Sequence, residues 1–196
     1  MQQEEALHVI LHERGEELTD AQFAVRMNEL YYADLYLRNY YREEAVKTLI
    51  THRIPVVVMG GDWDQFPQEE NEYFMRKPPV DFSITFQKIA EYAILLNVSP
   101  LFRAGVHDRV FAAMANRAVC MTERNCYMQK QFSNQKNIVL FSLKDKTELS
   151  YIAEELLINK ERRQEIAENA YKEFKTKYSW EKRTRQFLEI TKRSRT

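Results

Sequence analysis

The chain has 196 residues, a length that suits one α/β domain with a buried core but not two. Its 29 basic and 29 acidic side chains cancel, so the bulk charge favours neither nucleic acid nor an anionic membrane as a partner. No apolar run reaches the roughly 20 residues of a transmembrane helix, and the N-terminus lacks a basic signal-peptide region. The two cysteines, Cys120 and Cys126, suit reduced thiols better than a disulfide framework. Together these features predict a cytoplasmic globular protein.

The first third of the chain is expected to be helical. Apolar residues recur at helical spacing within 4–18, and Thr19 with Asp20 offers a cap for a helical region that runs to about His52. This region contains a tyrosine-rich block, whose helical spacing favours packing in a core or interface over the stacking of nucleic-acid bases. The block comprises Tyr31, Tyr32, Tyr36, Tyr40 and Tyr41, with Arg38 and Arg42 between them. An aromatic helix face of this kind is also typical of chains that form homo-oligomers.

Strands and helices are expected to alternate in the rest of the chain. A short apolar strand at 56–59 ends at Gly60 and Gly61, and residues 62–79 read as a loop or a loop with a short helix. The elements expected after it are a strand near 81–86, a helix near 87–93, a strand at 94–98, a helix from about 107, a strand at 118–123, a short helix at 127–132, a strand at 137–143, and helices at 147–159, 162–177 and 180–192. This alternation predicts an α/β fold, a Rossmann-like parallel sheet with helices on both faces, a helical N-terminal extension and C-terminal helices.

The glycine pair at 60–61 ends a strand, where a doubly wound fold brings its backbone close to a ligand. The chain has neither a G-x-G-x-x-G nor a G-x-x-x-x-G-K-[ST] motif, so dinucleotide-binding and P-loop assignments are weak. From the residues alone, a plain tight turn and a ligand-binding loop both remain open.

The most informative segment is 94–124, which predicts a buried strand, a glycine-bearing loop, an amphipathic helix and a second buried strand. The loop brings His107, Asp108 and Arg109 to the first turn of that helix. A helix start at the carboxyl end of a parallel strand offers free N–H groups and a positive dipole end to a phosphate, and Arg109 adds an always-charged fork. This pattern favours recognition of a nucleotide or a sugar nucleotide. The alternative is that Asp108 caps the helix while His107 and Arg109 lie on its solvated face.

Two further patterns carry little chemistry. His8 and His12 stand four residues apart on a helix, but no third ligand accompanies them and no metal site is predicted. The tail from Lys175 to Thr196 holds eight basic residues against two glutamates, which suits a membrane surface or, more commonly, a solvated helix end.

From Asp81 to Ile190 the order of signals resembles the C-terminal, donor-binding half of a GT-B glycosyltransferase. In that superfamily an apolar strand ending in Ser-Pro is followed by a glycine-bearing loop, an Ala- and Met-rich helix and a short strand. The matching segments here are EYAILLNVSP, LFRAGVHDRVF, AAMANR and AVCMTE, and the family's tail recurs as KTELSYIAEELL, EIAENAYKEFKTKYSWEKR and TRQFLEI. The spore-maturation-like branch is most similar, since an LNVSP-type strand there precedes a Gly-x-x-x-Arg helix start. Upstream, IPVVVMGGDW resembles the first strand and glycine turn of the same domain.

The resemblance implies a Rossmann-like domain at 54–196 that binds a nucleoside-diphosphate sugar, with residues 1–53 as a helical segment packed on it. In the family the donor lies across the strand ends with its diphosphate on a helix N-terminus, and it is a substrate rather than a cofactor. Carried over, the donor-binding residues are Gly60, Gly61, Asn97, Ser99, Gly105, His107, Asp108 and Arg109. Arg109 and the helix dipole would stabilise the departing diphosphate.

Two departures from the family pattern bear on activity. Many retaining members carry two glutamates spaced E-x7-E around this loop and helix, whereas the region near Ala104 and Ala112 has none. The N-terminal acceptor half of a GT-B enzyme is also missing, so it is expected from a longer protein or a partner chain. We therefore expect donor binding with little or no turnover by this chain alone. The alternative is a non-catalytic α/β interaction module that retains the glycosyltransferase fold.

Overall fold

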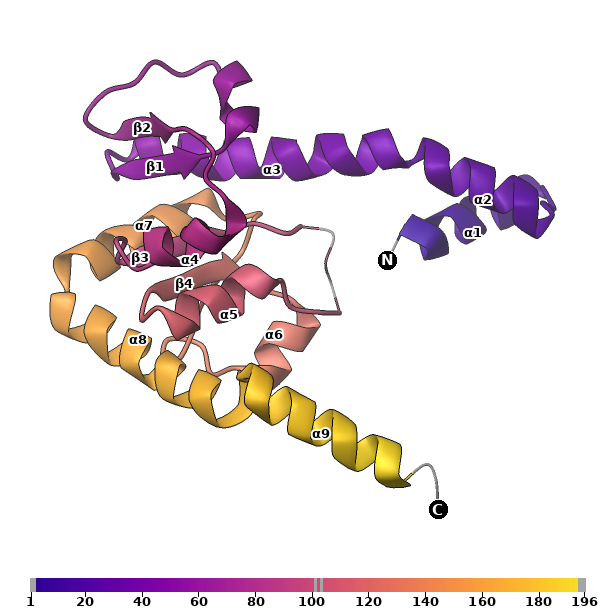
Figure 1. Ribbon diagram of the computed structural model, residues 1–196. Helices are drawn as coiled ribbons and strands as arrows, with labels where there is room; N and C mark the ends of the chain where they lie inside the picture. The colour runs from indigo at the N-terminus through magenta and orange to yellow at the C-terminus, as the bar shows by residue number, and fades with distance from the viewer. Residues whose placement is uncertain (1–2, 101, 103, 194–196) are drawn as a thin grey trace.

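The computed structural model describes residues 3–100, 102 and 104–193, and its strands and helices alternate after a helical N-terminal third (Figure 1). In chain order the elements are α1 (Gln3–Arg14), α2 (Asp20–Glu29), α3 (Tyr31–Thr51), β1 (Val56–Met59), η1 (Gly61–Gln65), β2 (Phe74–Lys77), α4 (Phe82–Ile89), β3 (Ile94–Asn97), α5 (Asp108–Ala115), β4 (Val119–Glu123), α6 (Cys126–Gln131), β5 (Val139–Phe141), α7 (Lys146–Ile158), α8 (Lys160–Glu173), η2 (Phe174–Tyr178) and α9 (Trp180–Arg193). Here η1 is a 3-10 turn and η2 a π-helical turn. Two residues of the loop before α5, Leu101 and Arg103, and the last three of the basic tail lie outside the described residues.

The named strands pair in parallel throughout and form two sheets. The smaller sheet pairs β1 with β2, with Val56 opposite Phe74. The larger sheet has the order β3-β4-β5, with Ile94 opposite Val119. The expected α/β, Rossmann-like fold class is confirmed, although the parallel strands form two separate sheets, β1-β2 and β3-β4-β5.

Helices cover both faces of the larger sheet, because each of its strands turns alternate side chains to opposite sides. Met121 and Phe141 pack with residues of α3 and α7 in one core cluster. Cys120 and Leu140 pack with residues of α5 and α6 in the other. Every residue of β4 and β5 is buried, the pattern of a parallel sheet covered on both faces.

The long helix α3 connects both sheets to the N-terminal extension. Its second half buries Ala45 and Leu49 in a core cluster of the larger sheet. It also buries Val46 in a smaller cluster with Val58 and Phe74 of β1 and β2. Figure 1 shows α1, α2 and the first half of α3 extending away from the body of alternating strands and helices.

The tyrosine-rich block does not fill the core of its own chain. Tyr31, Tyr32 and Tyr36 are exposed, and Tyr32 leaves 76% of its surface to solvent. Tyr41 is the member of the block that packs against a core cluster of the described residues. The reason is positional, since the first half of α3 lies beyond both sheets (Figure 1).

Helix ends in the N-terminal third follow the sequence signals in part. The helix expected over 4–18 ends at Arg14, because Gly15 takes a φ of 63° that stops it. Thr19 caps α2 as expected, in a capping box with Gln22.

Three expectations in the region between β1 and β3 are wrong. The strand expected at 81–86 is the helix α4, in which Phe82, Phe86 and Ile89 recur at helical spacing, and the helix expected near 87–93 ends at Ile89. The strand β2, conversely, lies within the expected loop. Only Phe74 of its four residues is buried, so its sequence FMRK carries no apolar run.

The described helices include none that is long and apolar enough to cross a bilayer. Both cysteines are free thiols, as expected. Cys120 is buried within β4, and Cys126 is exposed at the start of α6.

Candidate functional site

The carboxyl ends of β3 and β4 carry a connected set of polar side chains. Asn97 Nδ2 donates to Thr122 Oγ1 at 2.9 Å, and Thr122 Oγ1 donates to Glu123 Oε2 at 3.3 Å. The backbone N–H of Ser99 donates to Glu123 Oε1 at 2.8 Å. Asn97, Thr122 and Glu123 are buried, and burial raises the pKa of the Glu123 carboxyl. This network fixes the turn that leaves β3 and leads toward α5.

The helix α5 begins beyond that turn, with His107 as its N-cap. The imidazole Nδ1 of His107 accepts hydrogen bonds from the backbone N and the Nε of Arg109, each at 3.3 Å. Burial and then the Arg109 charge lower the pKa of His107, which favours the neutral imidazole that these donors require. Asp108 contacts the same ring from an exposed position. The cap of this helix is therefore His107 and not Asp108.

Two arginines from different elements meet beside this helix start. Arg109 is half-buried, and its pKa is lowered by burial and then by the nearby charge of Arg42. Arg42 comes from α3 and donates through Nε to the carbonyl of Val98, just beyond β3, at 3.4 Å. Burial and then the charge of Arg38 lower the pKa of Arg42 as well. Within the residues that the structure describes, neither Arg42 nor Arg109 forms an ion pair.

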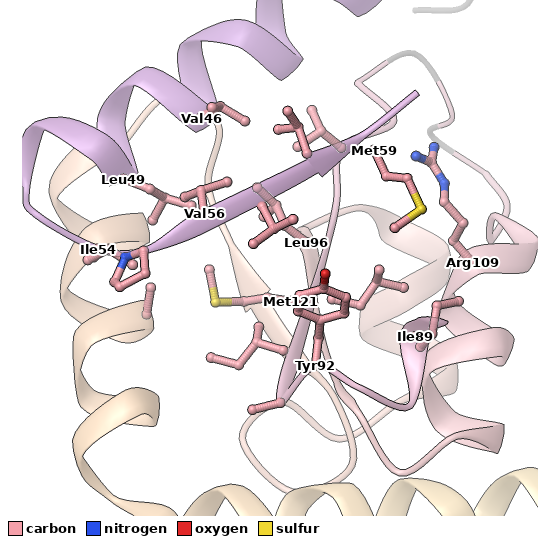
Figure 2. Close-up of a pocket in the computed structure, with 18 of the residues that line it drawn as sticks. Val46, Leu49, Ile54, Val56, Met59, Ile89, Tyr92, Leu96, Arg109 and Met121 are labelled. Atoms are coloured by element: carbon pink, nitrogen blue, oxygen red, sulfur yellow. The ribbon is translucent and has the colours of Figure 1, made fainter. Parts of the chain in front are cut away.

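A cavity of about 400 Å³ lies between β1 and β3. Figure 2 shows Met59 and Arg109 at one end of this cavity and Ile54 at the opposite end. Its lining is mostly apolar, and the side chains of Arg42 and Arg109 both contribute to it. A mostly apolar cavity with a few converging polar groups is the usual form of a small-molecule site.

Gly60 and Gly61 follow β1 at the carboxyl edge of the smaller sheet. Gly60 has a φ of 131°, and its N–H donates to the carbonyl of Lys77 at 3.2 Å. This backbone conformation by itself favours glycine. A Cβ built on either glycine meets no atom within 4 Å, so the space beside this backbone is open. The turn therefore explains Gly60, and the open space leaves room for a ligand.

Gly105 lies in the loop before α5 and has a packing reason to be glycine. A Cβ there would come within 2.7 Å of Cε1 of the Phe102 ring. Asn125 Nδ2 holds the same loop by donating to the carbonyls of Phe102 at 3.0 Å and Gly105 at 3.3 Å. A side chain at position 105 would therefore require the half-exposed Phe102 ring to move.

The structure brings the expected residues to the carboxyl edges of the two sheets. Gly60 and Gly61 follow β1, Asn97 and Ser99 end or follow β3, Gly105 lies in the loop beyond, and His107, Asp108 and Arg109 begin α5. Three residues of this edge lie outside the set expected from the sequence: Arg42, Thr122 and Glu123. Thr122 and Glu123 are polar residues that end an apolar strand, which is a readable signal. Arg42 reaches the edge only through the packing of α3.

The described residues hold no cluster of three His, Cys, Asp or Glu side chains that suits a metal ion. His8 stacks on Phe23, with ring centroids 4.3 Å apart, as a packed helix residue. The cationic groups at the sheet edge are the guanidinium groups of Arg42 and Arg109 beside the start of α5, and they suit an anion.

Parallel strands with an arginine-bearing helix start at their carboxyl ends define a Rossmann-like domain. A family model described as "Glycosyl transferase-like" matches residues 38–189. The chain belongs to this family, and the match begins within α3, so it includes Arg42. A comparison with curated proteins gives no match.

Several solved structures are similar to the chain. Anabaena HepE in complex with UDP has a TM-score of 0.63 and 13% identity, covering 74% of this chain and 44% of that chain. HepE in complex with UDP-glucose has a TM-score of 0.61 and 14% identity, covering 74% of this chain and 44% of that one. The C-terminal domain of a glycosyl transferase group 1 family protein (LpcC) from Francisella tularensis has a TM-score of 0.51 and 12% identity, covering 68% of this chain and 92% of that one.

At these identities the structural likeness shows the fold alone, and the chain spans less than half of the length of HepE. Together with the family match, it confirms the resemblance to the C-terminal half of a GT-B, group 1 glycosyltransferase. The spore-maturation-like branch stays a prediction.

Proposed function

We propose that the chain is the donor-binding part of a glycosyltransferase and that it binds a nucleoside-diphosphate sugar at the carboxyl edge of its strands. The observation that carries this proposal is the position of Arg109. Its half-buried guanidinium lines the cavity beside the start of α5 and has no ion pair within the described part of the chain. A partly desolvated cation beside the positive end of a helix dipole attracts a phosphate. The HepE structures, which contain UDP or UDP-glucose, support the same class of ligand.

In this proposal the diphosphate of the donor lies on the first turn of α5. Arg109 and the helix dipole offset the negative charge that develops as the diphosphate departs from the anomeric carbon. His107 holds the guanidinium of Arg109 in place through the hydrogen bond from Nε to its Nδ1. Asp108 is exposed beside His107, where its carboxylate would accept a hydrogen bond from a sugar hydroxyl.

The other residues proposed for donor binding act through the shape of the edge. Asn97 and Ser99 hold the ends of β3 and β4 together through the buried network around Glu123. Gly60 and Gly61 leave open space beside β1 for the donor. Gly105 accepts a hydrogen bond from Asn125 through its carbonyl in the loop before α5.

We further propose that turnover needs an acceptor-binding half from a longer protein or a partner chain. No glutamate stands at or beside Ala104 and Ala112, where retaining relatives carry their E-x7-E pair. The same observation favours a second candidate function, a non-catalytic interaction module that retains the fold. The cytoplasmic location and the division into a 1–53 segment and a 54–196 domain stay predictions.

Thermal unfolding of the purified chain with UDP, GDP, ADP, dTDP and CMP, and with their common sugar conjugates, tests donor binding. A ligand that binds only the folded chain stabilises it by about 2.7 kcal/mol at a hundredfold excess over Kd. We expect one nucleoside diphosphate and its sugar conjugates to raise Tm, and Arg109→Gln to remove most of the increase.

Arg117→Gln is the matched control, because Arg117 follows the opposite end of α5 and pairs with Glu168 at 3.0 Å. This variant should respond to ligand as the unmodified chain does. If no ligand at millimolar concentration raises Tm of the unmodified chain, donor binding is contradicted and the interaction module is favoured.

A further inference from the structure

We propose that Arg42 is a second arm of the anion site, so that a diphosphate is gripped by one guanidinium from α3 and one from α5. This inference rests on the proposed function, since it states how the diphosphate of the donor is held. It assigns a ligand-binding residue to the helix that precedes the first strand.

Interactions with three parts of the chain locate the Arg42 head group. Its Nε donates to the carbonyl of Val98 at 3.4 Å, at the carboxyl end of β3. Burial lowers the pKa of Arg42, and the charge of Asp62, which follows the glycine pair after β1, opposes this effect by raising that pKa. On α5, the Arg42 charge adds to burial in lowering the pKa of Arg109 and of His107. Arg42 thus lies among the segments that carry the expected donor-binding residues.

Two half-buried guanidinium groups on one cavity repel each other unless an anion lies between them. Arg42 and Arg109 both line the cavity, and neither has an ion pair among the residues described. Glu123 is the buried carboxylate nearby, but its oxygens already accept hydrogen bonds from Ser99 and Thr122. Asp62 and Glu123 attract Arg42, and Asp108 and Glu123 attract Arg109, but none of these carboxylates forms an ion pair with either guanidinium within the described residues. An incoming phosphate would therefore supply the direct anionic partner that the two guanidinium groups lack.

Arg38, one turn earlier on the same face of α3, shows the contrasting case. Its Nη2 pairs with Asp34, and 51% of its side chain is exposed. Arg38 therefore has a carboxylate partner and faces solvent, whereas Arg42 lines the cavity without one. The same helix thus provides a control arginine for the proposed binding arginine.

Two guanidinium groups on separate elements suit a diphosphate better than a monophosphate. Each fork can take two oxygens of one phosphate, so two arms can hold two successive phosphates. We therefore expect Arg42 to govern how strongly the site prefers pyrophosphate to orthophosphate.

Calorimetric titration of the full chain with inorganic pyrophosphate and with orthophosphate tests the second arm without a base or sugar. We expect Arg42→Gln to weaken pyrophosphate binding by about tenfold or more and orthophosphate binding by less than about threefold, because one phosphate occupies one arm. Arg42→Lys keeps the charge but not the fork, and should fall between Arg42→Gln and the unmodified chain. Arg38→Gln should bind both anions as the unmodified chain does.

Equal pyrophosphate affinity in Arg42→Gln and the unmodified chain, with weaker binding in Arg109→Gln, overturns the second arm and leaves the proposed function standing. Failure of the unmodified chain to bind any nucleoside diphosphate overturns the proposed function itself. The Tm of each variant without ligand checks folding, and a single cooperative unfolding transition in Arg42→Gln shows that this variant folds. If Arg42→Gln does not fold, Arg42→Lys decides, and unchanged pyrophosphate affinity in that variant overturns the second arm.

Discussion

The two sheets of this domain are stabilised in different ways. In the larger sheet every residue of β4 and β5 is buried. In the smaller sheet only Val58 of β1 and Phe74 of β2 are buried. There the guanidinium of Arg76 donates to three loop carbonyls between residues 63 and 68, at 2.6 to 3.0 Å. The larger sheet thus depends on apolar burial, and the smaller one depends on a charged hydrogen-bond network.

This difference bears on function because the candidate site has one edge on each sheet. Gly60 and Gly61 follow β1 of the smaller sheet, whereas Asn97 ends β3 of the larger one. Since fewer buried apolar contacts mean a lower free energy of local opening, we expect the smaller sheet to open first. A ligand bound across both edges would then tie the less stable sheet to the more stable one.

The largest expected effect comes from the same substitution made in each sheet. Phe141→Ala removes a fully buried ring from a large core cluster and should lower the free energy of unfolding by about 3–5 kcal/mol. Phe74 is equally buried but belongs to a cluster of four buried residues. Phe74→Ala should therefore speed amide exchange in β1 and β2 much more than in β4. Equal loss of protection in β4 would mean that the two sheets unfold as one unit.

The charged network of the smaller sheet gives the next effect. Arg76→Lys keeps the charge and three N–H donors, but it loses the planar fork whose Nε and Nη2 reach carbonyls on different parts of the loop. Because a hydrogen bond to a charged group contributes about 1.5–3 kcal/mol, we expect a loss of about 2 kcal/mol in unfolding free energy, measured by urea titration. Arg117→Lys, an exposed arginine paired with Glu168, is the control and should change stability much less. A similar loss in both variants would mean that the network does not hold the smaller sheet.

The glycine pair distinguishes backbone conformation from crowding at the end of β1. Gly60 has a φ of 131°, which an L side chain rarely adopts, so Gly60→Ala should cost about 1–3 kcal/mol of stability. Gly61 has no such φ and no atom near a built Cβ, so Gly61→Ala should cost less than about 1 kcal/mol. Thermal unfolding of the two variants side by side measures the difference. A larger loss in Gly61→Ala would contradict the conformational explanation.

The same contrast explains which parts of the fold were predictable from the sequence. The sequence predicts strands β3, β4 and β5 correctly, because a strand that is buried on both faces has a continuous run of apolar residues. It does not predict strand β2, because the sequence FMRK buries one apolar residue and carries two cations. The sequence predicts a strand in place of helix α4 because the apolar residues Phe82, Ile84 and Phe86 occupy every second position. Phe82, Phe86 and Ile89 also have helical spacing, so both patterns fit this segment.

The residues of the candidate site divide in the same way. Asn97 and Ser99 could be selected because they end or follow the apolar strand β3, and Arg109 because it lies in the first turn of the next helix. Arg42 could not, because it lies on a helix ahead of β1 and reaches Val98 only when α3 packs on the sheets. Local sequence thus identifies the residues that follow a strand, and tertiary packing decides which helix joins them.

The smallest effect concerns Glu123, a buried carboxylate at the carboxyl end of β4 in the larger sheet. Burial raises its pKa above the ordinary value of 4.5, so the folded chain holds this proton more tightly than the unfolded chain. Its contribution to stability is therefore greatest at low pH and is lost as the pH rises from about 4.5 through the raised pKa. Glu123→Gln keeps the size and an oxygen for the Ser99 N–H but does not ionise.

Urea unfolding of the unmodified chain and of Glu123→Gln between about pH 4.5 and 8 measures this contribution. The unmodified chain should lose stability relative to the variant as the pH rises, with Glu154→Gln, an exposed glutamate, as the control for charge removal. A difference that stayed constant with pH would mean that the folded chain holds the Glu123 proton no more tightly than the unfolded chain does. The hydrogen bonds from Ser99 and Thr122 would then fully offset the free-energy cost of desolvating this carboxylate, and burying Glu123 would not lower the stability of the larger sheet.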